Sequence, residues 1–273
     1  MPELPEVETV VRDLRPLLVG RCIRSVSLSH DDVLRGVTRR RLLRRLKGAT
    51  IREVTRRGKH AVYHLGSLKL VVQPGMTGSL MIHHRVPPDE ERYTVLRVGL
   101  DDGRTLVYHD VRRLGTLLLL NDVGWNAYTA AIGPEPLDPG FTAAQFREVL
   151  GGTRQAIKKA VMDQRLVAGV GNIYANEALF AAGVDPSRAA DTLNPAEHKH
   201  LYRELRRILS AAIASSGTTF RDYRTGTGEP GNFQLELLVY ERAGQPCRRC
   251  GTRLTGTHAI DARITVFCHR CQR

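Results

Sequence analysis

Four of the five cysteines of this 273-residue chain stand in two pairs close to its last residue. Cys247 and Cys250 form one Cys-x-x-Cys pair, and Cys268 and Cys271 form the other. Two such pairs let four thiolates reach one tetrahedral Zn²⁺ ion, and four protein ligands leave no position for a reacting water. We therefore predict one structural zinc ion. The alternating segment between the pairs predicts a short β-hairpin that presents Arg263 to a partner.

The residues from Met1 to Glu6 hold a second set of groups that can do chemistry. Pro2 is small, so removal of Met1 is expected and would expose a secondary amine. An α-amino group has a pKa of about 8, which leaves a nucleophilic fraction near neutral pH that can form a Schiff base. Glu3 and Glu6 share one helix face and are candidates for general acid or base. The alternative is that these acids only stabilise the start of the helix, by interacting favourably with the helix dipole.

The positive charge of the chain is concentrated in two segments. The whole chain has 41 Lys and Arg against 28 Asp and Glu, a net charge of +13 that favours a polyanionic partner. Residues 12–59 carry fifteen basic and four acidic side chains, and residues 242–273 carry seven and one. We expect these two elements to contact one nucleic acid. The alternative is a solvated surface, because Arg39–Arg45 has the leucine spacing of an exposed helix.

Composition and the first residues bear on location. With 42% hydrophobic and 25% charged residues, the chain is neither disordered nor a polytopic membrane protein. No stretch approaches the ~20 apolar residues of a transmembrane helix, so the positive charge favours nucleic acid over a membrane as the partner. The acidic N-terminus lacks the basic and apolar regions of a secretory signal. We expect a cytoplasmic protein of the bacterial, nucleoid-associated type.

Hydrophobic periodicity changes from a strand pattern to a helix pattern along the chain. A helix is predicted at residues 5–18 and is followed by β-rich runs, which indicate an antiparallel sandwich or barrel. The proline- and glycine-rich segment 133–140 marks a domain boundary. The predicted strands are residues 22–28, 50–55, 60–65, 68–73, 95–100, 105–108 and 116–120, and the later helices are residues 142–150, 153–164, 172–182 and 194–216.

Five sequence blocks follow one another along the chain, namely Met1–Thr9, Gly75–Gly78, Asp110–Gly115, Gly169–Tyr174 and the four-cysteine module. Their content and order resemble the formamidopyrimidine-DNA glycosylase/endonuclease VIII family of base-excision repair enzymes. Leu4 is typical of the formamidopyrimidine branch, whereas the endonuclease VIII branch usually has glycine there.

The resemblance implies an α+β fold that clamps damaged duplex DNA. The expected parts are an N-terminal helix with an antiparallel β-sandwich (residues 1–132), a helix-two-turn-helix domain (133–240) and a zinc finger (241–273). The implied substrate is an oxidised purine, such as 8-oxoguanine or a formamidopyrimidine, opposite cytosine, and the protein is expected to be a monomer. Residues 218–233 resemble the family's loop over the lesion base.

The resemblance also assigns catalytic roles. Pro2 would attack C1′ of the flipped-out nucleoside while Glu3 protonates the opening sugar and Glu6 assists, so that base loss and β,δ-elimination follow from one Schiff base. Lys59 matches the lysine that contacts the phosphate beside the lesion and acts as an acid in β-elimination. Arg263 matches the δ-elimination proton donor. Because a guanidinium pKa exceeds ~12, we favour phosphate binding for Arg263.

Further residues match the family's DNA contacts. Asn172, which the sequence alone indicates as a helix N-cap, would hold the kinked backbone with Lys59 and Arg263. Tyr240 and Arg154 are further candidate contacts. The positions that match the trio filling the gap left by the flipped base, with one of them bonding the orphaned partner base, are Met76, Arg112 and Leu114.

Four residues, at three sites, depart from the usual family pattern. Leu114 replaces a common phenylalanine, which weakens the stacking wedge. Gln73-Pro74 replaces a frequent His-Leu pair, and Tyr93 stands where a DNA-contacting histidine is common. Two other functions remain open at this point, namely the same chemistry on oxidised pyrimidines and a non-catalytic damaged-DNA-binding protein.

Overall fold

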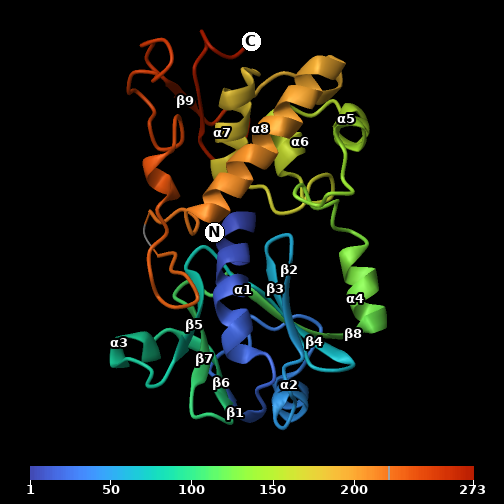
Figure 1. Ribbon diagram of the computed structural model, residues 1–273, viewed down its shortest axis with the longest axis vertical. Coiled ribbons are helices and arrows are strands. Elements are labelled where there is room, and N and C mark those ends of the chain that lie inside the picture. Colours follow the sequence, from blue (N-terminus) through green and yellow to red (C-terminus); the bar gives the residue numbers. More distant parts are fainter. Residues whose placement is uncertain (221) are drawn as a thin grey trace. The chain divides into compact units, whose positions relative to one another are not determined.

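The computed structural model describes residues 1–220 and 222–273, whose contacts divide the chain into two compact units. The first unit consists of residues 1–130 and 215–234, and the second consists of residues 131–214 and 235–273. The structure confirms a mixed α+β chain in which strands dominate the first unit and helices the second (Figure 1). Each unit is described by itself below.

Helix α1 (Leu4–Leu18) begins the first unit and confirms the predicted helix. Pro5 suits the first turn, where its missing N–H has no intrahelical partner. Val7, Val11 and Leu14 form one buried face that packs into the core between the strands. The helix ends before Gly20, whose positive φ of 86° turns the chain.

Two four-stranded antiparallel sheets enclose this core. One has the order β1-β6-β7-β5 and the other β2-β3-β4-β8. The predicted strand at residues 50–55 begins three residues later in the structure, because Thr50 instead forms an isolated bridge with Cys22. The strand at Gly78–His83 was not predicted. The strands are β1 (Ile23–Leu28), β2 (Glu53–Arg57), β3 (His60–His64), β4 (Leu68–Gln73), β5 (Gly78–His83), β6 (Thr94–Leu100), β7 (Thr105–Asp110) and β8 (Thr116–Asn121).

Three short helices lie between or after the strands of the sandwich. Helix α2 (Arg39–Leu46) buries Leu42 and Leu46 in the core, α3 (Pro88–Glu91) precedes β6, and α4 (Asp122–Thr129) follows β8. Trp125 and Tyr128 of α4 pack against a small cluster of sheet side chains, Val62, Val71 and Leu118. Helix α4 therefore covers the face of the β2-β3-β4-β8 sheet that looks away from the main core.

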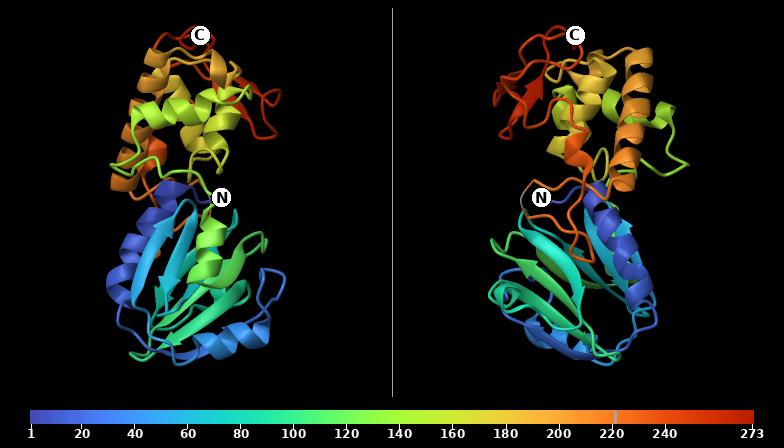
Figure 2. Two further views of the ribbon diagram at one scale, coloured as in Figure 1. Left: turned by 90° about the vertical axis from the view of Figure 1, so that its right-hand side faces the viewer. Right: turned by 60° about the vertical axis from the view of Figure 1, so that its left-hand side comes forward.

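Residues 215–234 return to the first unit, although the sequence placed residues 218–233 with the helical domain. Gly226 donates its N–H to the Asp13 carboxylate at 3.1 Å. A Cβ on Gly226 would lie 2.9 Å from Asp13 Cβ and from Leu14 Cγ. The segment, drawn orange beside α1 in Figure 2, thus packs closely on the helix. Such contacts between residues more than 200 positions apart leave no local sequence pattern.

The second unit contains four α-helices, one single-turn 3-10 segment and a short hairpin among its described residues, and the 3-10 turn η2 spans the point in the sequence where the chain passes from the first unit to the second. Helix α7 begins and ends where predicted, and Gly183, with a positive φ of 71°, terminates it. The helix predicted from residue 153 begins only at Ile157. The elements are α5 (Ala143–Gly151), α6 (Ile157–Met162), α7 (Asn172–Ala182), η1 (Ala190–Thr192), α8 (Pro195–Ala214), η2 (Phe233–Leu235), β9 (Thr255–Thr257) and β10 (Thr265–Phe267).

Among the described residues, no helix combines the length and the apolar character that crossing a membrane requires.

Candidate active site

The amino end of α1 gathers three of the predicted catalytic residues in buried positions: Pro2, Glu3 and Glu6. The Glu6 carboxylate accepts a hydrogen bond from the Glu3 backbone N–H at 2.9 Å through Oε2. Its other oxygen, Oε1, accepts one from the Thr218 backbone N–H at 2.8 Å. Glu6 therefore joins the start of α1 to the segment 215–234.

Lys59 lies close enough to the chain's amino group to change its protonation. Burial lowers the pKa of the Met1 amine below its ordinary value, and the positive charge of Lys59 acts in the same direction. Glu3 and Glu6 oppose this effect. The structure thus brings the amino terminus, two carboxylates and one lysine together, and the net effect enlarges the neutral fraction of the amine.

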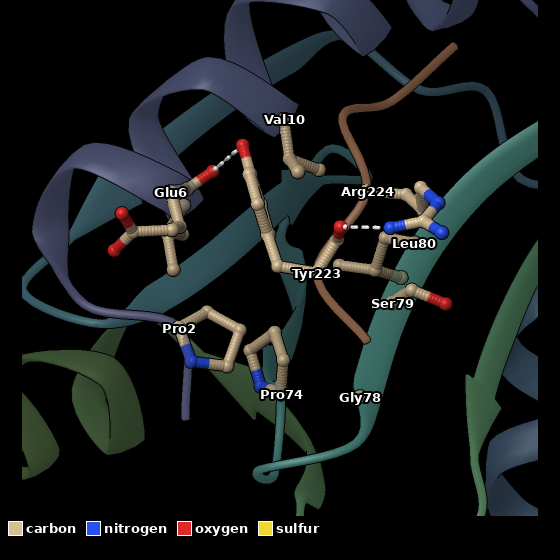
Figure 3. Close-up of a pocket in the computed structure, with 10 residues that line it drawn as sticks. Pro2, Glu6, Val10, Pro74, Gly78, Ser79, Leu80, Tyr223 and Arg224 are labelled. Carbon is tan, nitrogen blue, oxygen red and sulfur yellow. Dashed lines mark hydrogen bonds between the residues drawn. The ribbon is translucent and has the colours of Figure 1, made fainter. Parts of the chain in front are cut away.

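A small pocket opens beside these groups (Figure 3). Pro2 and Pro74 lie next to each other on one side, and Tyr223 stands between α1 and β5 on the other. The Tyr223 hydroxyl donates to the backbone carbonyl oxygens of Glu6 at 3.2 Å and of Ser216 at 3.1 Å. The pocket is therefore lined by two regular elements, α1 and β5, and by Tyr223, which is bonded to the start of α1.

The turn between β2 and β3 carries Lys59, whose side chain is buried. Gly58 has a positive φ of 55°, which makes the tight turn possible. Arg56 pairs with Glu8 at 2.9 Å and donates to the Gly58 carbonyl at 2.9 Å. Burial alone would raise the Glu8 pKa, but hydrogen bonds from Arg12 and Arg56 outweigh it and lower the pKa. This network fastens the Lys59 turn to the side of α1.

His60 holds the same turn from the opposite side. Its Nδ1 lies 2.9 Å from the Arg57 carbonyl oxygen, and its Nε2 lies 2.9 Å from the Tyr128 hydroxyl of α4. Because a carbonyl only accepts, Nδ1–H is the donor, and in the neutral ring Nε2 accepts from Tyr128. Sequence reasoning missed this pair, because its two residues are 68 positions apart.

Asp110, at the end of β7, ties two loops of the first unit together. Its buried carboxylate accepts from the Thr77 hydroxyl at 2.6 Å, the Tyr108 hydroxyl at 2.9 Å and the Gly115 N–H at 2.9 Å. The loops approach so closely that a Cβ on Gly75 would lie 2.6 Å from the Gly115 nitrogen. The loops 74–78 and 111–115 therefore behave as one structural element.

These joined loops present the predicted wedge residues to solvent. Met76 is 44% exposed and Leu114 is 54% exposed, although both are apolar. Arg112 is also exposed, and its backbone N–H donates to the Thr77 hydroxyl at 3.0 Å. Exposed large apolar side chains on a fixed loop are typical of a binding surface. Tyr93 is half-buried and makes an edge-to-face ring contact with His109 at 5.7 Å.

In the second unit, Asn172 lies beside the segment that carries Arg263. The N-cap of α7 is Gly171, so the prediction that Asn172 caps this helix is wrong. Its side-chain amide instead donates to the Ile264 carbonyl at 3.1 Å. Lys158, which is fully buried, donates to the same carbonyl at 3.2 Å and to the Thr265 hydroxyl at 2.8 Å. The structure thus fixes the chain directly after Arg263.

The guanidinium of Arg263 is held by a neighbouring carboxylate. Arg263 donates both its backbone N–H, at 2.9 Å, and its Nε–H, at 3.0 Å, to Asp261 Oδ1. Burial would raise the Asp261 pKa, but these bonds outweigh it and lower the pKa. The Arg263 side chain is 52% exposed. It is therefore oriented by Asp261 and still available to a ligand.

Tyr240 and Arg154 are held very differently. The Tyr240 backbone N–H donates at 2.8 Å to Oε1 of Glu177, a buried carboxylate of α7 that also accepts from the N–H groups of Leu238 and Val239 at 2.9 Å. Burial raises the Glu177 pKa, and the three bonds oppose that rise. Arg154 is 94% exposed and lies 3.7 Å from Asp191.

The four predicted ligands, Cys247, Cys250, Cys268 and Cys271, form one cluster in which all sulfur atoms lie within 4.8 Å of one another. Two of the sulfur–sulfur distances are 3.5 and 3.9 Å. A tetrahedral ion with Zn–S bonds of ~2.3 Å requires edges of about 3.8 Å, so the donors fit zinc. The hairpin β9–β10 confirms the predicted element between the pairs.

Two family models match most of the chain. Residues 1–117 match the formamidopyrimidine-DNA glycosylase N-terminal domain, and residues 132–224 match the H2TH domain of the same enzymes. The chain belongs to the formamidopyrimidine-DNA glycosylase family. The second match covers the four helices of the second unit and continues to residue 224, and the cysteine cluster follows it in the sequence as a zinc-finger-like module.

Relatives in the formamidopyrimidine-DNA glycosylase family span the full length of the chain. It is 44% identical to the formamidopyrimidine-DNA glycosylase of Laribacter hongkongensis and 38% identical to that of Bacillus subtilis, with at least 99% of each chain covered. The crystal structure of the MutM (Fpg) protein of Thermus thermophilus is similar with a TM-score of 0.88 and 39% identity, covering 99% and 98% of the two chains.

A similar structure also contains DNA. The wild-type Lactococcus lactis Fpg in complex with DNA containing N7-benzyl-Fapy-dG has a TM-score of 0.91 and 33% identity, and both chains are covered completely.

Proposed function

We propose that this DNA glycosylase of base excision repair removes oxidised purines, such as 8-oxoguanine and formamidopyrimidines, from duplex DNA and then cleaves the strand. The observation that carries the proposal is the buried Pro2 at the amino terminus, beside Glu3, Glu6 and Lys59. A primary amine on Met1 is present in the full chain, and the proposed nucleophile is the secondary amine of Pro2 after removal of Met1.

The chemistry follows from an amine at a glycosidic carbon. The Pro2 nitrogen bonds to C1′ as the bond from C1′ to the base breaks, and the departing base takes up one proton while the Pro2 nitrogen loses its own. Glu3 donates a proton to O4′ as the C1′–O4′ bond breaks, which leaves an iminium between Pro2 and C1′. Loss of the C2′ proton then expels the 3′ phosphate, and a second elimination expels the 5′ phosphate.

Glu6 has a positioning part in this scheme. Both of its carboxylate oxygens accept backbone N–H groups, one from Glu3 and one from Thr218. Both oxygens of Glu6 must therefore be acceptors, and the bond to the Glu3 N–H orients Glu3 relative to the amine. Lys59 is proposed to bind the phosphate beside the lesion and to supply a proton during β-elimination, and the Arg56–Glu8 pair keeps its turn in place.

We assign DNA contacts to exposed side chains on fixed elements. Met76, Arg112 and Leu114 stand on the joined loops and are proposed to fill the gap left by the flipped base, with Arg112 bonding the orphaned cytosine. Tyr93 is proposed as a phosphate contact. The proposed contacts of the second unit are Arg154, Asn172, Tyr240 and Arg263.

One Zn²⁺ ion is proposed as a structural cofactor held by the four clustered cysteines. All four ligands are protein thiolates, so the ion would leave no position for substrate. Arg249 would be fixed near this site, since its guanidinium lies 4.5 Å from the Phe180 ring centre and donates to the Phe180 carbonyl. The zinc finger would thereby be anchored to α7.

We further propose that the protein acts as a cytoplasmic monomer with a catalytic domain at residues 1–132, a helix-two-turn-helix domain at 133–240 and a zinc finger at 241–273. In this scheme the loop 218–233 closes over the lesion base. The contact of Thr218 with Glu6 supports that role, because it couples the loop to the catalytic helix.

Excision assays on matched duplexes test the proposed substrate. Duplexes carrying 8-oxoguanine, a formamidopyrimidine or an oxidised pyrimidine, each opposite cytosine or its normal partner, are incubated with excess enzyme and the release of base is timed. We expect the two purine lesions to be excised faster. Faster excision of the pyrimidine would assign the endonuclease VIII type of specificity, and no excision would leave a damaged-DNA-binding protein.

A further inference from the structure

Helix α2 presents a dense basic surface that none of the proposed catalytic steps uses. Its sequence, from Arg39 to Leu46, contains five arginines and no acid. Leu42 and Leu46 are fully buried in the core of the first unit and Leu43 packs against it, whereas the arginines are exposed. We call the exposed residues Arg40, Arg41, Arg44 and Arg45 the α2 arginines.

The α2 arginines form no ion pair with an acidic side chain in the part of the chain that the structure describes. On this helix, Arg39 is the only arginine that forms an ion pair within the described residues, with Asp31 at 2.6 Å. The first turn holds Arg40 and Arg41 but no acid, which opposes the helix dipole. Residues four apart, such as Arg40 and Arg44, also repel each other. A sequence that is locally unfavourable in this way is expected where a ligand supplies the missing charge.

The position of α2 separates it from the candidate active site. After α2 the chain returns along the carboxyl end of α1, where Gly20 donates to the Ile51 carbonyl at 2.8 Å. Strand β2 then runs along α1 toward its amino end: Arg15 donates to the Val54 carbonyl, and Glu8 pairs with Arg56. Figures 1 and 2 show α2 and the N-terminus at opposite ends of the first unit.

The basic side chains of the segment 12–59 therefore do not all lie on one surface. Helix α1 has 15 residues and is therefore about 22 Å long. Lys59 lies at its amino end and the α2 arginines at its carboxyl end. The positive charge of the segment is thus divided between two surfaces.

We propose that the α2 arginines bind the phosphate backbone of a second duplex DNA segment, distinct from the segment that enters the active site. An eight-residue helix is about 12 Å long, and duplex DNA presents about seven phosphates over that length, so four arginines can all be matched. A membrane surface fits less well, because membrane-lying helices insert an apolar face and the leucines of α2 are buried in the protein.

Such a surface would let the enzyme hold two DNA segments at once and transfer between them during the search for damage. Backbone contacts of this kind are independent of sequence and are weakened by salt. The proposal depends on DNA as the partner but not on the chemistry at Pro2.

A two-duplex binding experiment tests the proposal. The protein is first saturated with a short unlabelled duplex that carries a lesion, and a fluorescent undamaged duplex is then titrated at several salt concentrations while anisotropy is recorded. The test variant replaces Arg40, Arg41, Arg44 and Arg45 with Gln, and the matched control replaces the same four with Lys. Glutamine and lysine are both good helix formers, and α2 keeps its buried leucines.

We expect the wild-type protein and the Lys control to bind the second duplex. The Gln variant should bind it more weakly, and the slope of log affinity against log salt should fall by up to about 3.6, since each phosphate contact contributes about 0.9. Excision from the short duplex should be unchanged in all three proteins. Second-duplex binding that is equal in wild type and Gln variant would overturn the proposal, and so would tighter binding of RNA or of an acidic peptide. If instead the proposed function is wrong, the protein will not excise the lesion from the short duplex, while its binding of the second duplex stays intact.

Discussion

Replacing Glu6 with Gln should release the segment 215–234 from the start of α1. In the structure the Glu6 carboxylate accepts two buried backbone N–H groups, from Glu3 at 2.9 Å and from Thr218 at 2.8 Å. A glutamine side chain has one acceptor oxygen, which can bond the N–H of either Glu3 or Thr218. Its NH₂ group, which only donates, then faces the other N–H. One hydrogen bond to a charged acceptor is lost, and its donor is left unpaired.

The size of this effect follows from the bond that is broken. Hydrogen bonds to charged groups contribute about 1.5–3 kcal/mol, which corresponds to roughly a 10- to 150-fold change in the local opening equilibrium. The Tyr223 hydroxyl still bonds the Glu6 carbonyl oxygen in the variant, so the segment should loosen without global unfolding.

Hydrogen exchange measures this opening directly. Peptides that cover Thr218 should exchange faster in Glu6→Gln by about that factor, while peptides of β3 and β4 should be unchanged. Glu8→Gln is the matched control, since Glu8 lies on the same helix but bonds Arg12 and Arg56. Equal protection of the Thr218 peptide in wild type and Glu6→Gln would refute the coupling.

Three further predictions concern stability and metal. Hydrogen bonds from Arg12 and Arg56 hold the Glu8 pKa below its unfolded value of 4.5, so its carboxylate stabilises the fold above that pH, and the contribution is lost as the pH falls through the folded pKa. In urea unfolding at decreasing pH, the free energy of unfolding should therefore fall more steeply in wild type than in Glu8→Gln. Parallel curves for the two proteins would contradict this. Tyr128→Phe removes the donor to His60 Nε2 and should lower the free energy of unfolding by about 1–3 kcal/mol, with faster exchange of the turn that carries Lys59; an unchanged turn would show that His60 does not support it. Cys268→Ser should reduce bound zinc from one equivalent per chain and weaken DNA binding, measured by metal analysis and anisotropy, whereas full DNA affinity without zinc would argue against a structural role.

Local sequence patterns were sufficient for the elements that have strong local signals. Helix α1 carries an apolar stripe with Pro5 at its start, and α7 ends at a glycine in the left-handed region. Strand β5 was missed because its apolar run, Leu80 to Ile82, does not alternate and directly follows a glycine-rich turn. Helix α4 was missed because Gly124 lies inside it and its cap, Asn121, closes a strand.

The residues that position the site could not be found from local pattern, because their partners are distant in the chain. Glu177 accepts from backbone groups more than 60 positions away, and Asp110 joins two loops. A buried carboxylate on a helix looks in sequence like any other acid on its polar face. The charge count had the same weakness, since it could not separate the α2 arginines from Lys59.

Trapping the covalent intermediate tests the central claim most directly. The enzyme with Met1 removed is mixed with duplex DNA containing 8-oxoguanine opposite cytosine and reduced with borohydride, and the adduct is mapped by mass spectrometry. We predict that the DNA remnant is attached to the Pro2 nitrogen and that protein retaining Met1 gives no such adduct. An adduct of equal yield in protein that retains Met1, or one mapped to Lys59, would contradict the account.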